Sequence, residues 1–187
     1  MFQPVIKWSG SKRTQAFELF RIFPKFKNYY EPFLGGGSML YPLNGQFNKA
    51  FCGDICKPLI ELWTLIRDNP IELVNNYRKN WNRLQNEGHT AYYEIRERFN
   101  SDQNPKDLFF LSRTCVNGLI RFNKKGGFNN SLHHTRKGIH PDRAKKLILD
   151  WSKLVENVNF MFGDYHITTE SATADDLVYL DPPYFNT

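Results

Sequence analysis

Short apolar segments that alternate with amphipathic helical segments constrain the fold of this chain most strongly. Four runs read as strands: residues 29–33, 50–53, 158–162 and 177–180. The last two are short apolar runs, which suit buried parallel strands. Apolar periodicity predicts helices over residues 11–23, from about 38, and over 58–68, 71–100 (broken near 88), 105–116 and 141–156. Strands that alternate with helices predict an α/β fold around a parallel sheet.

The middle of the chain differs from its two ends. Residues 69–156 are predominantly helical, and residues 118–141 are rich in Gly, Asn and Lys with little periodicity, which predicts loops or a hairpin. We therefore predict one α/β domain formed by residues 1–68 and 157–187. The helical residues 69–156 then form an insert in that domain.

Positive charge is concentrated in the insert. The chain has 25 Lys and Arg against 19 Asp and Glu, a net charge of +6. Residues 112–146 hold nine basic residues and one acidic residue, or +8, whereas the rest holds 16 basic and 18 acidic residues, or −2. A concentrated basic segment favours a polyanionic partner, nucleic acid first, although a solvated charged face explains the charge alone equally well.

Several classes of protein are not supported by the sequence. No run of about 18 apolar residues predicts a transmembrane helix, and the N-terminus has no apolar signal-peptide core. Cys52, Cys56 and Cys115 lack zinc-site spacing, and the adjacent His133 and His134 have no third ligand at a suitable spacing. We expect reduced thiols, no metal and a cytoplasmic location.

A glycine cluster follows the first predicted strand in the sequence Glu-Pro-Phe-Leu-Gly-Gly-Gly-Ser, residues 31–38. Glycines between a strand and a helix let the backbone approach a ligand closely, and the absence of a following Gly-Lys-Ser/Thr excludes a Walker loop. Asp54 ends the second strand, where a carboxylate can bind both hydroxyls of a ribose. The pair predicts a nucleoside ligand without phosphates; the alternative is a tight turn beside a surface aspartate.

The tetrapeptide Asp181-Pro182-Pro183-Tyr184 follows the last predicted strand. Two prolines fix the backbone and donate no N–H, so a carboxylate, a carbonyl and an aromatic ring are presented together. Two acceptors on the N–H groups of an exocyclic amine would keep electron density on its nitrogen, while the ring stacks on the base. The alternative is a strand-ending turn.

These motifs, with a third, resemble a known family. The third motif is Lys-Trp-x-Gly-x-Lys at residues 7–12, which taken alone could be a helix start capped at Ser11. It is followed along the chain by the glycine motif, by Gly-Asp-Ile at residues 53–55 and by the Asp-Pro-Pro-Tyr motif. This order is similar to that of the Dam-type (D12 class) DNA adenine-N6 methyltransferases. Residues 113–123 are similar to the family's Arg-x-x-x-Asn-Gly-Leu-x-Arg-x-Asn element.

The resemblance implies a Rossmann-like S-adenosylmethionine-dependent methyltransferase sheet with a helical, basic target-recognition insert. It implies S-adenosylmethionine as methyl donor, a flipped adenine as target and direct transfer without metal. The implied catalytic residues are Asp181, Pro182 and Tyr184. The implied cofactor-binding residues are Trp8 and Lys12 at the methionine part, Phe33, Gly35 and Gly37 by backbone, Asp54 at the ribose, Asp164 at the adenine, and Asp181.

The implied partner is double-stranded DNA, and the family link suggests a restriction-modification system. Phosphate contacts are predicted for Lys124, Lys125, Arg136 and Lys137. Arg121 and Asn117 are candidates for base edges, because Arg and Asn bind guanine and adenine bidentately. Arg113 and Asn123 belong to the same DNA-binding element. For each residue, a phosphate contact or plain solvent exposure is an equally good interpretation.

Two departures from the family pattern qualify these expectations. The family's Phe-Asn-Val-Pro-x-Gly is here the run from Phe128 to His133, which does not support GATC as the recognised sequence. The chain ends three residues after Tyr184, so we expect an incomplete sheet with an exposed edge strand, and a missing C-terminal portion or self-association. The alternative functions are an inactive fragment that binds DNA or cofactor, and a methyltransferase for RNA or a protein amide.

Overall fold

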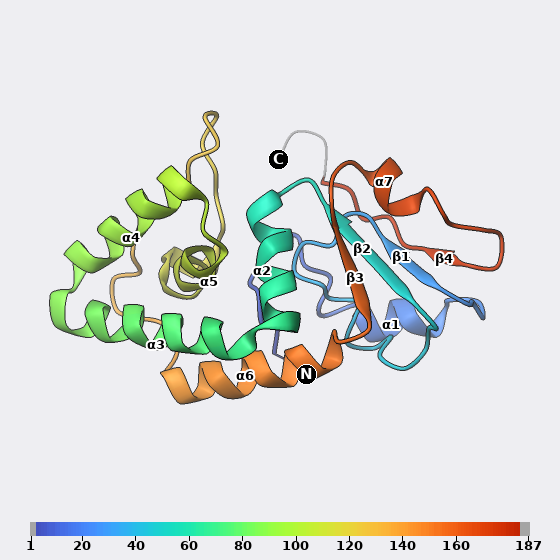
Figure 1. Ribbon diagram of the computed structural model, residues 1–187, viewed down its shortest axis with the longest axis horizontal. Helices are drawn as coiled ribbons and strands as arrows, with labels where there is room; N and C mark the ends of the chain where they lie inside the picture. Colours follow the sequence, from blue (N-terminus) through green and yellow to red (C-terminus); the bar gives the residue numbers. More distant parts are fainter. Residues whose placement is uncertain (1–2, 184–187) are drawn as a thin grey trace.

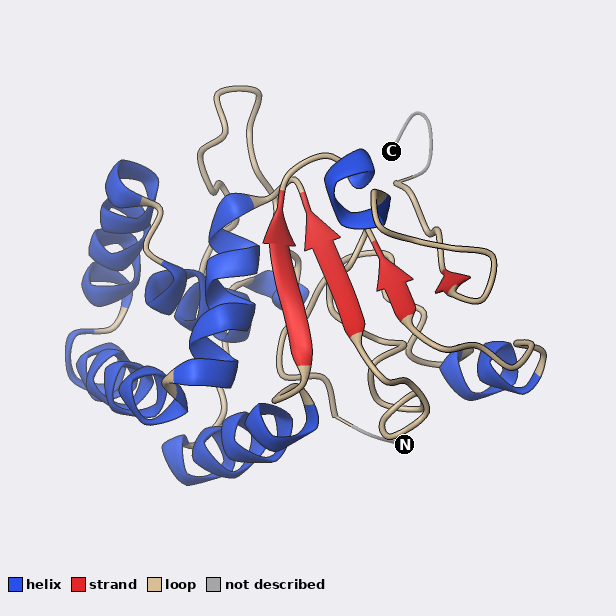
Figure 2. Ribbon diagram, turned by 45° about the vertical axis from the view of Figure 1, so that its right-hand side comes forward, coloured by secondary structure: helices blue, strands red, loops and turns tan. Residues whose placement is uncertain are grey.

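The fold is built on a small parallel sheet. A computed structural model describes residues 3–183. The strands are β1 (Tyr29–Glu31), β2 (Ala50–Asp54), β3 (Val158–Phe162) and β4 (Leu177–Val178). All neighbouring strands are parallel and follow the order β3-β2-β1-β4 (Figures 1 and 2). The predicted α/β class with a parallel sheet is therefore confirmed.

Helices cover the two faces of the sheet because successive strand residues point to opposite sides. On one face, Trp63 of α2 (Lys57–Asp68) stacks on Phe160 of β3, the partner of Cys52, with ring centroids 5.6 Å apart. On the other face, Thr168 of α7 (Tyr165–Thr169) lies against Gly53, where an added Cβ would come within 1.9 Å of its Oγ1. Gly53 is thus the residue that lets α7 approach β2.

A helical unit packs beside α2. It consists of α3 (Pro70–Glu87), α4 (His89–Asp102), α5 (Pro105–Thr114) and α6 (Pro141–Leu154), as Figure 1 shows. Three of these helices begin at proline, and the Asn69 and Asn104 side chains cap α3 and α5 by accepting backbone N–H groups. One hydrophobic core runs from the sheet through α2 into this unit. The division into an α/β domain (residues 1–68 and 157–187) and an insert (residues 69–156) stays a prediction.

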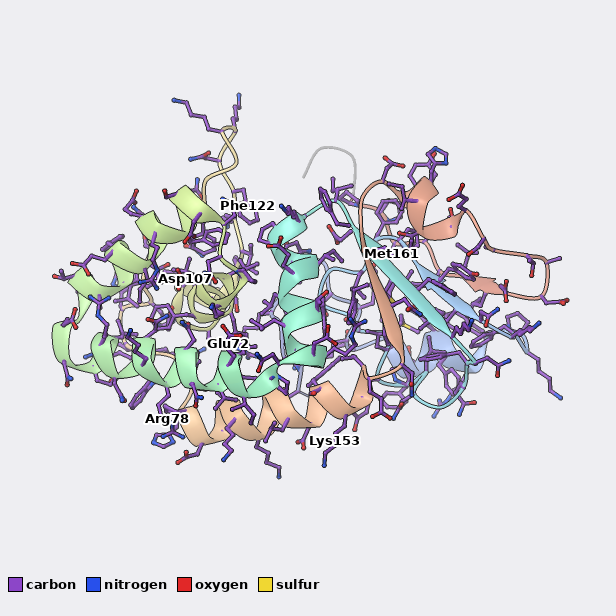
Figure 3. All side chains as sticks on the ribbon, viewed as in Figure 1. Glu72, Arg78, Asp107, Phe122, Lys153 and Met161 are labelled. Atoms are coloured by element: carbon purple, nitrogen blue, oxygen red, sulfur yellow. The ribbon has the colours of Figure 1, made fainter. Side chains whose placement is uncertain are left out.

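Inside the helical unit, an ion pair between half-exposed Arg98 and buried Asp107 holds α4 to α5. The Arg98 guanidinium donates from Nε and Nη2 to the two carboxylate oxygens of Asp107, each at 2.6 Å. Asp107, which is labelled in Figure 3, is 1% exposed. Two parallel hydrogen bonds give such a pair a defined geometry. The unit is therefore a fixed support for the segment that follows α5.

That segment forms a hairpin that projects from the body of the molecule between α5 and α6 (Figure 1). It includes the short 3-10 helix η1 (Val116–Gly118). Antiparallel bridges join Cys115 to Leu132 and Phe122 to Phe128. The irregular or hairpin structure predicted for residues 118–141 is confirmed.

Two predicted helices differ in the structure. The helix predicted over residues 11–23 is only α1 (Ala16–Arg21), because the preceding residues turn so that Ser11 bonds Ser38 and Lys12 bonds Asp181. The helix predicted from about residue 38 is wrong, since the chain makes successive turns there. Pro42 lacks the N–H that would bond the carbonyl of residue 38 and so prevents a regular helix.

The strand ends place a crevice at one end of the sheet. β1 ends at Glu31, before Pro32, and β4 lies at the sheet edge with Tyr179 N–H donating to the Tyr30 carbonyl at 2.8 Å. β2 and β3 follow β1 on one side, whereas β4 lies on its other side. The strand order therefore reverses between β1 and β4. In open α/β sheets, ligands bind at such a reversal, in the crevice outside the carboxyl ends of the strands.

Candidate active site

A cavity of about 690 Å³ lies at the carboxyl ends of β1, β2 and the segment after β4. Its size is typical of small-molecule sites. It brings together most of the predicted catalytic and cofactor-binding residues, and Arg121 of the predicted DNA-binding element. The predicted residues that line it are Trp8, Lys12, Phe33, Gly35, Asp54, Arg121, Asp181 and Pro182.

The glycine loop forms one wall. Gly35 has φ +47, and an added Cβ would lie 2.7 Å from Cδ1 of Trp8. The Gly35 carbonyl accepts a hydrogen bond at 3.0 Å from Nε1 of buried Trp63. Gly37, in contrast, packs against the Trp63 ring and does not line the cavity. Two glycines thus let two tryptophans approach the loop from its two sides.

Asp54 fixes the same loop through its carboxylate. Oδ2 accepts the Gly35 N–H at 3.1 Å, and Oδ1 accepts the Cys56 N–H at 2.9 Å. Burial raises the pKa of this carboxyl, and the backbone hydrogen bonds oppose that shift. Asp54 therefore connects the end of β2 to the glycine loop at the cavity wall.

An ion pair joins the two ends of the described chain. Nζ of Lys12 donates to Oδ1 and Oδ2 of Asp181 at 2.6 and 2.7 Å, across 169 positions of sequence. Both side chains are about a quarter exposed or less, at 21% and 25%. Ser11 and Ser38 lie beside them with their hydroxyl oxygens 2.7 Å apart. The Lys-Trp-x-Gly-x-Lys segment thus contacts both the glycine loop and the Asp-Pro-Pro segment.

Glu31 is a cavity residue that the sequence predictions left without a role. It is the last residue of β1, it is 3% exposed, and its Oε2 accepts the Tyr29 hydroxyl at 2.9 Å. Burial, with smaller contributions from Asp181 and Asp54, raises the pKa of its carboxyl to about 8. Its sequence signal was an acidic residue at the end of an aromatic strand, directly before proline.

Asp164, like Gly37, is a predicted cofactor-binding residue that does not line the cavity. It is exposed and caps α7, accepting the His166 N–H at 3.2 Å. It is close in sequence to Tyr165, whose ring stacks on that of Phe33 at 6.2 Å. Tyr184 lies outside the described residues.

The hairpin contributes to the wall of the cavity. Arg121 and Phe122 line it, and Phe122 is labelled in Figure 3. The Phe122 ring also lies near the rings of Phe99 and Phe128, with centroids 6.3 and 6.2 Å away. At the tip, Oδ1 of Asn123 accepts the N–H groups of residues 125 and 127, so this side chain closes the turn. The predicted DNA-binding residues that are exposed on this segment and near it are Asn117, Arg121, Asn123, Lys124, Lys125, Arg136 and Lys137.

Arg113 differs from the other predicted DNA contacts because it is buried. Its Nη2 donates to the carbonyls of Pro4 and Val5, and the guanidinium lies over the Phe109 ring. Burial lowers its pKa to about 10. The expected surface contact is therefore replaced by a bridge between the end of α5 and the N-terminal segment, and Arg113 leaves the set of DNA contacts that we propose.

The structure adds two observations on ligands and membranes. Within residues 3–183, no three His, Cys, Asp or Glu side chains gather closely enough to hold a metal ion. No helix in this described range is long and apolar enough to cross a membrane.

Comparison with known proteins identifies the family. The family model of the D12 class N6 adenine-specific DNA methyltransferases matches residues 8–187. The chain is 33% identical to the type II methyltransferase M.MjaIII of Methanocaldococcus jannaschii, over 97% of this chain and 69% of that protein. It is 31% identical to a DNA adenine methylase of Vibrio cholerae, over 96% of this chain and 64% of the relative.

A third relative is the type II methyltransferase M1.LlaDCHI of Lactococcus lactis, which is 30% identical over 97% of this chain and 66% of that protein. The chain thus spans about two thirds of the length of these relatives. The matches extend over the N-terminal motif, the glycine loop, the helical unit and the Asp-Pro-Pro segment. This chain belongs to the D12 class N6 adenine-specific DNA methyltransferases.

Proposed function

We propose that this chain transfers a methyl group from S-adenosylmethionine to N6 of an adenine in double-stranded DNA. One observation carries the proposal: the ion pair between Lys12 and Asp181 lies in a cavity that also contains Gly35, Asp54 and Arg121. A donor site and a residue of the basic hairpin therefore share one cavity.

The cavity walls fit the chemistry of the donor. Asp54 offers a carboxylate to ribose hydroxyls, and Trp8 and Phe33 offer aromatic surfaces. Gly35 lines the cavity without a side chain, so a ligand can approach the loop closely at that point. When bound, S-adenosylmethionine supplies a methyl group that the positive charge on sulfur activates for transfer. The chain then has to bind, orient and desolvate the reactants.

Asp181 and Pro182 orient the target amine in this proposal. Lys12 holds both carboxylate oxygens of Asp181, and the lone pairs that remain can accept an N–H of the amine. The Pro182 carbonyl accepts the second N–H. Both acceptors keep electron density on the amine nitrogen, which is otherwise delocalised into the ring. Tyr184 keeps its predicted role of stacking on the flipped adenine.

The hairpin and its surroundings bind the duplex in this proposal. Lys124 and Lys125 at the tip, with Arg136 and Lys137 before α6, supply phosphate contacts. Arg121 lies at the cavity wall and Asn117 is exposed at the start of the hairpin, so both can reach base edges.

A transfer assay tests the proposal. We expect transfer of label from S-adenosylmethionine to duplexes that contain adenine, and none to duplexes in which adenine is replaced by its deaminated analogue. Asp181→Ala should abolish transfer, whereas Asp150→Ala, which changes an exposed aspartate of α6 outside this cavity, should leave it unchanged.

Other outcomes separate the alternatives. Binding of DNA or donor without any transfer would indicate a binding module instead of an enzyme. Label on RNA that duplex DNA does not compete away would indicate an RNA substrate.

A further inference from the structure

Among the described residues, Glu31 is the cavity carboxyl that accepts the fewest hydrogen bonds. Within residues 3–183, the Tyr29 hydroxyl is its hydrogen-bond donor, and no Lys, Arg or His side chain pairs with it. The other two carboxylates of the cavity are held, Asp181 by Lys12 and Asp54 by two backbone N–H groups. A glutamate that is 3% exposed is rarely left without a cation.

The groups that face Glu31 are acidic or neutral. Tyr29 lies on β1, Cys52 and Asp54 lie on β2, and Asp181 follows β4. Lys12, a cation that lines the same cavity, is bound to Asp181. Because burial raises the pKa of Glu31 to about 8, its carboxyl is mostly protonated at neutral pH when no ligand is bound.

A positive charge in the cavity would favour the ionised form of Glu31 over the protonated form. A cation near a buried carboxylate favours the ionised form, and the low dielectric of a buried site strengthens the attraction. The methyl donor carries one positive charge more than its product, because the sulfonium becomes a neutral thioether on transfer. The two ligands otherwise have the same groups, so they differ mainly in the charge that they place in the cavity.

We propose that Glu31 is the charge-selecting residue of the donor site: it favours the cationic donor over the thioether product and releases a proton when the donor binds. This inference rests on the proposed function, since it takes the donor to be S-adenosylmethionine. Selection by charge would let the product leave a site whose remaining contacts it shares with the donor. A carboxylate that only shaped the cavity would treat both ligands alike.

Isothermal titration calorimetry tests the inference without requiring catalysis. Donor and S-adenosylhomocysteine are each titrated at pH 7 in two buffers of different ionisation enthalpy, which counts the protons released. We expect nearly one proton for the donor and clearly fewer for the product. Between pH 6.5 and 8, donor affinity should rise by up to about tenfold per pH unit, and product affinity by less.

Variants assign the effect to this side chain. Glu31→Gln keeps the shape and an acceptor for Tyr29, and should lower the preference for donor over product about tenfold and remove the excess proton release. Glu31→Asp keeps the charge and should restore part of both. Glu97→Gln, at an exposed glutamate of α4, is the matched control and should change neither.

The outcomes also separate this inference from the proposed function. Equal proton release for the two ligands in the unsubstituted chain would overturn the inference even if Glu31→Gln failed to fold. An unchanged affinity ratio in folded Glu31→Gln would do the same. Failure of both ligands to bind the unsubstituted chain would instead contradict the proposed function.

Discussion

Gly35 lies where a side chain would displace the wall of the donor cavity. Its φ of +47 is in the left-handed region, and an added Cβ would approach Trp8 to 2.7 Å. We expect Gly35→Ala to weaken binding of S-adenosylmethionine at least about tenfold, because the Trp8 ring must move. Gly45→Ala is the control, since Gly45 has φ +76 but no atom within 4 Å of the added Cβ. Equal donor affinity in both variants, measured by calorimetry, would show that the contact with Trp8 is unimportant.

Arg113 is the residue whose place in the structure differs most from expectation. We expect Arg113→Met to destabilise the protein by about 2–3 kcal/mol, because the carbonyls of Pro4 and Val5 lose a charged donor. Urea denaturation measures this change. If stability is unchanged while DNA affinity falls, Arg113 contacts DNA after all. Arg136→Met, at an exposed site, should leave stability unchanged.

At the scale of elements, the projecting hairpin is the part most exposed to a duplex. Replacing Lys124 and Lys125 with alanine should reduce the slope of log affinity against log salt by about two, because two phosphate contacts are lost. The double change Lys25→Ala and Lys49→Ala, at exposed sites outside the hairpin, is the control. Fluorescence anisotropy with a labelled duplex at several salt concentrations measures both. An unaltered slope in the hairpin variant would place the DNA elsewhere.

For the whole molecule, the buried carboxyls predict a pH dependence of stability. The pKa of Glu31 is raised in the folded state, so the folded protein binds this proton more tightly than the unfolded chain does. Its contribution is fully present below about pH 4.5 and is lost as pH rises to about 8. We therefore expect the free energy of unfolding of the ligand-free protein to fall between pH 5 and 8, and to fall less in Glu31→Gln. Urea denaturation at four pH values tests this, and parallel curves for the two proteins would refute it.

The raised pKa of Asp54 acts in the same direction as that of Glu31. Asp68 and Asp176 have lowered pKa values, so their stabilising contributions are lost only at more acidic pH. The comparison with Glu31→Gln therefore isolates a single group within the range from pH 5 to 8.

The sequence by itself determined the strands, most helices and the family of this protein. These features depend on local periodicity, on the positions of prolines and on short motifs. All three can be recognised from residues that are close together in the sequence. Even the wrong prediction of a helix from about residue 38 has a local cause in the sequence, because Pro42 prevents a regular helix there. The end of β1 at Glu31 likewise follows from Pro32.

Only the tertiary structure decided which polar groups meet and which are buried. Lys12 and Asp181 are 169 positions apart, and their contact depends on the strand order that places β4 beside β1. Charge patterns counted Arg113 with the exposed cations of the insert, because a sequence does not report solvent exposure. Glu31 gained its altered pKa from burial and from carboxylates on two other segments. Desolvation and charge interactions act through space, so they became visible only when the chain was folded.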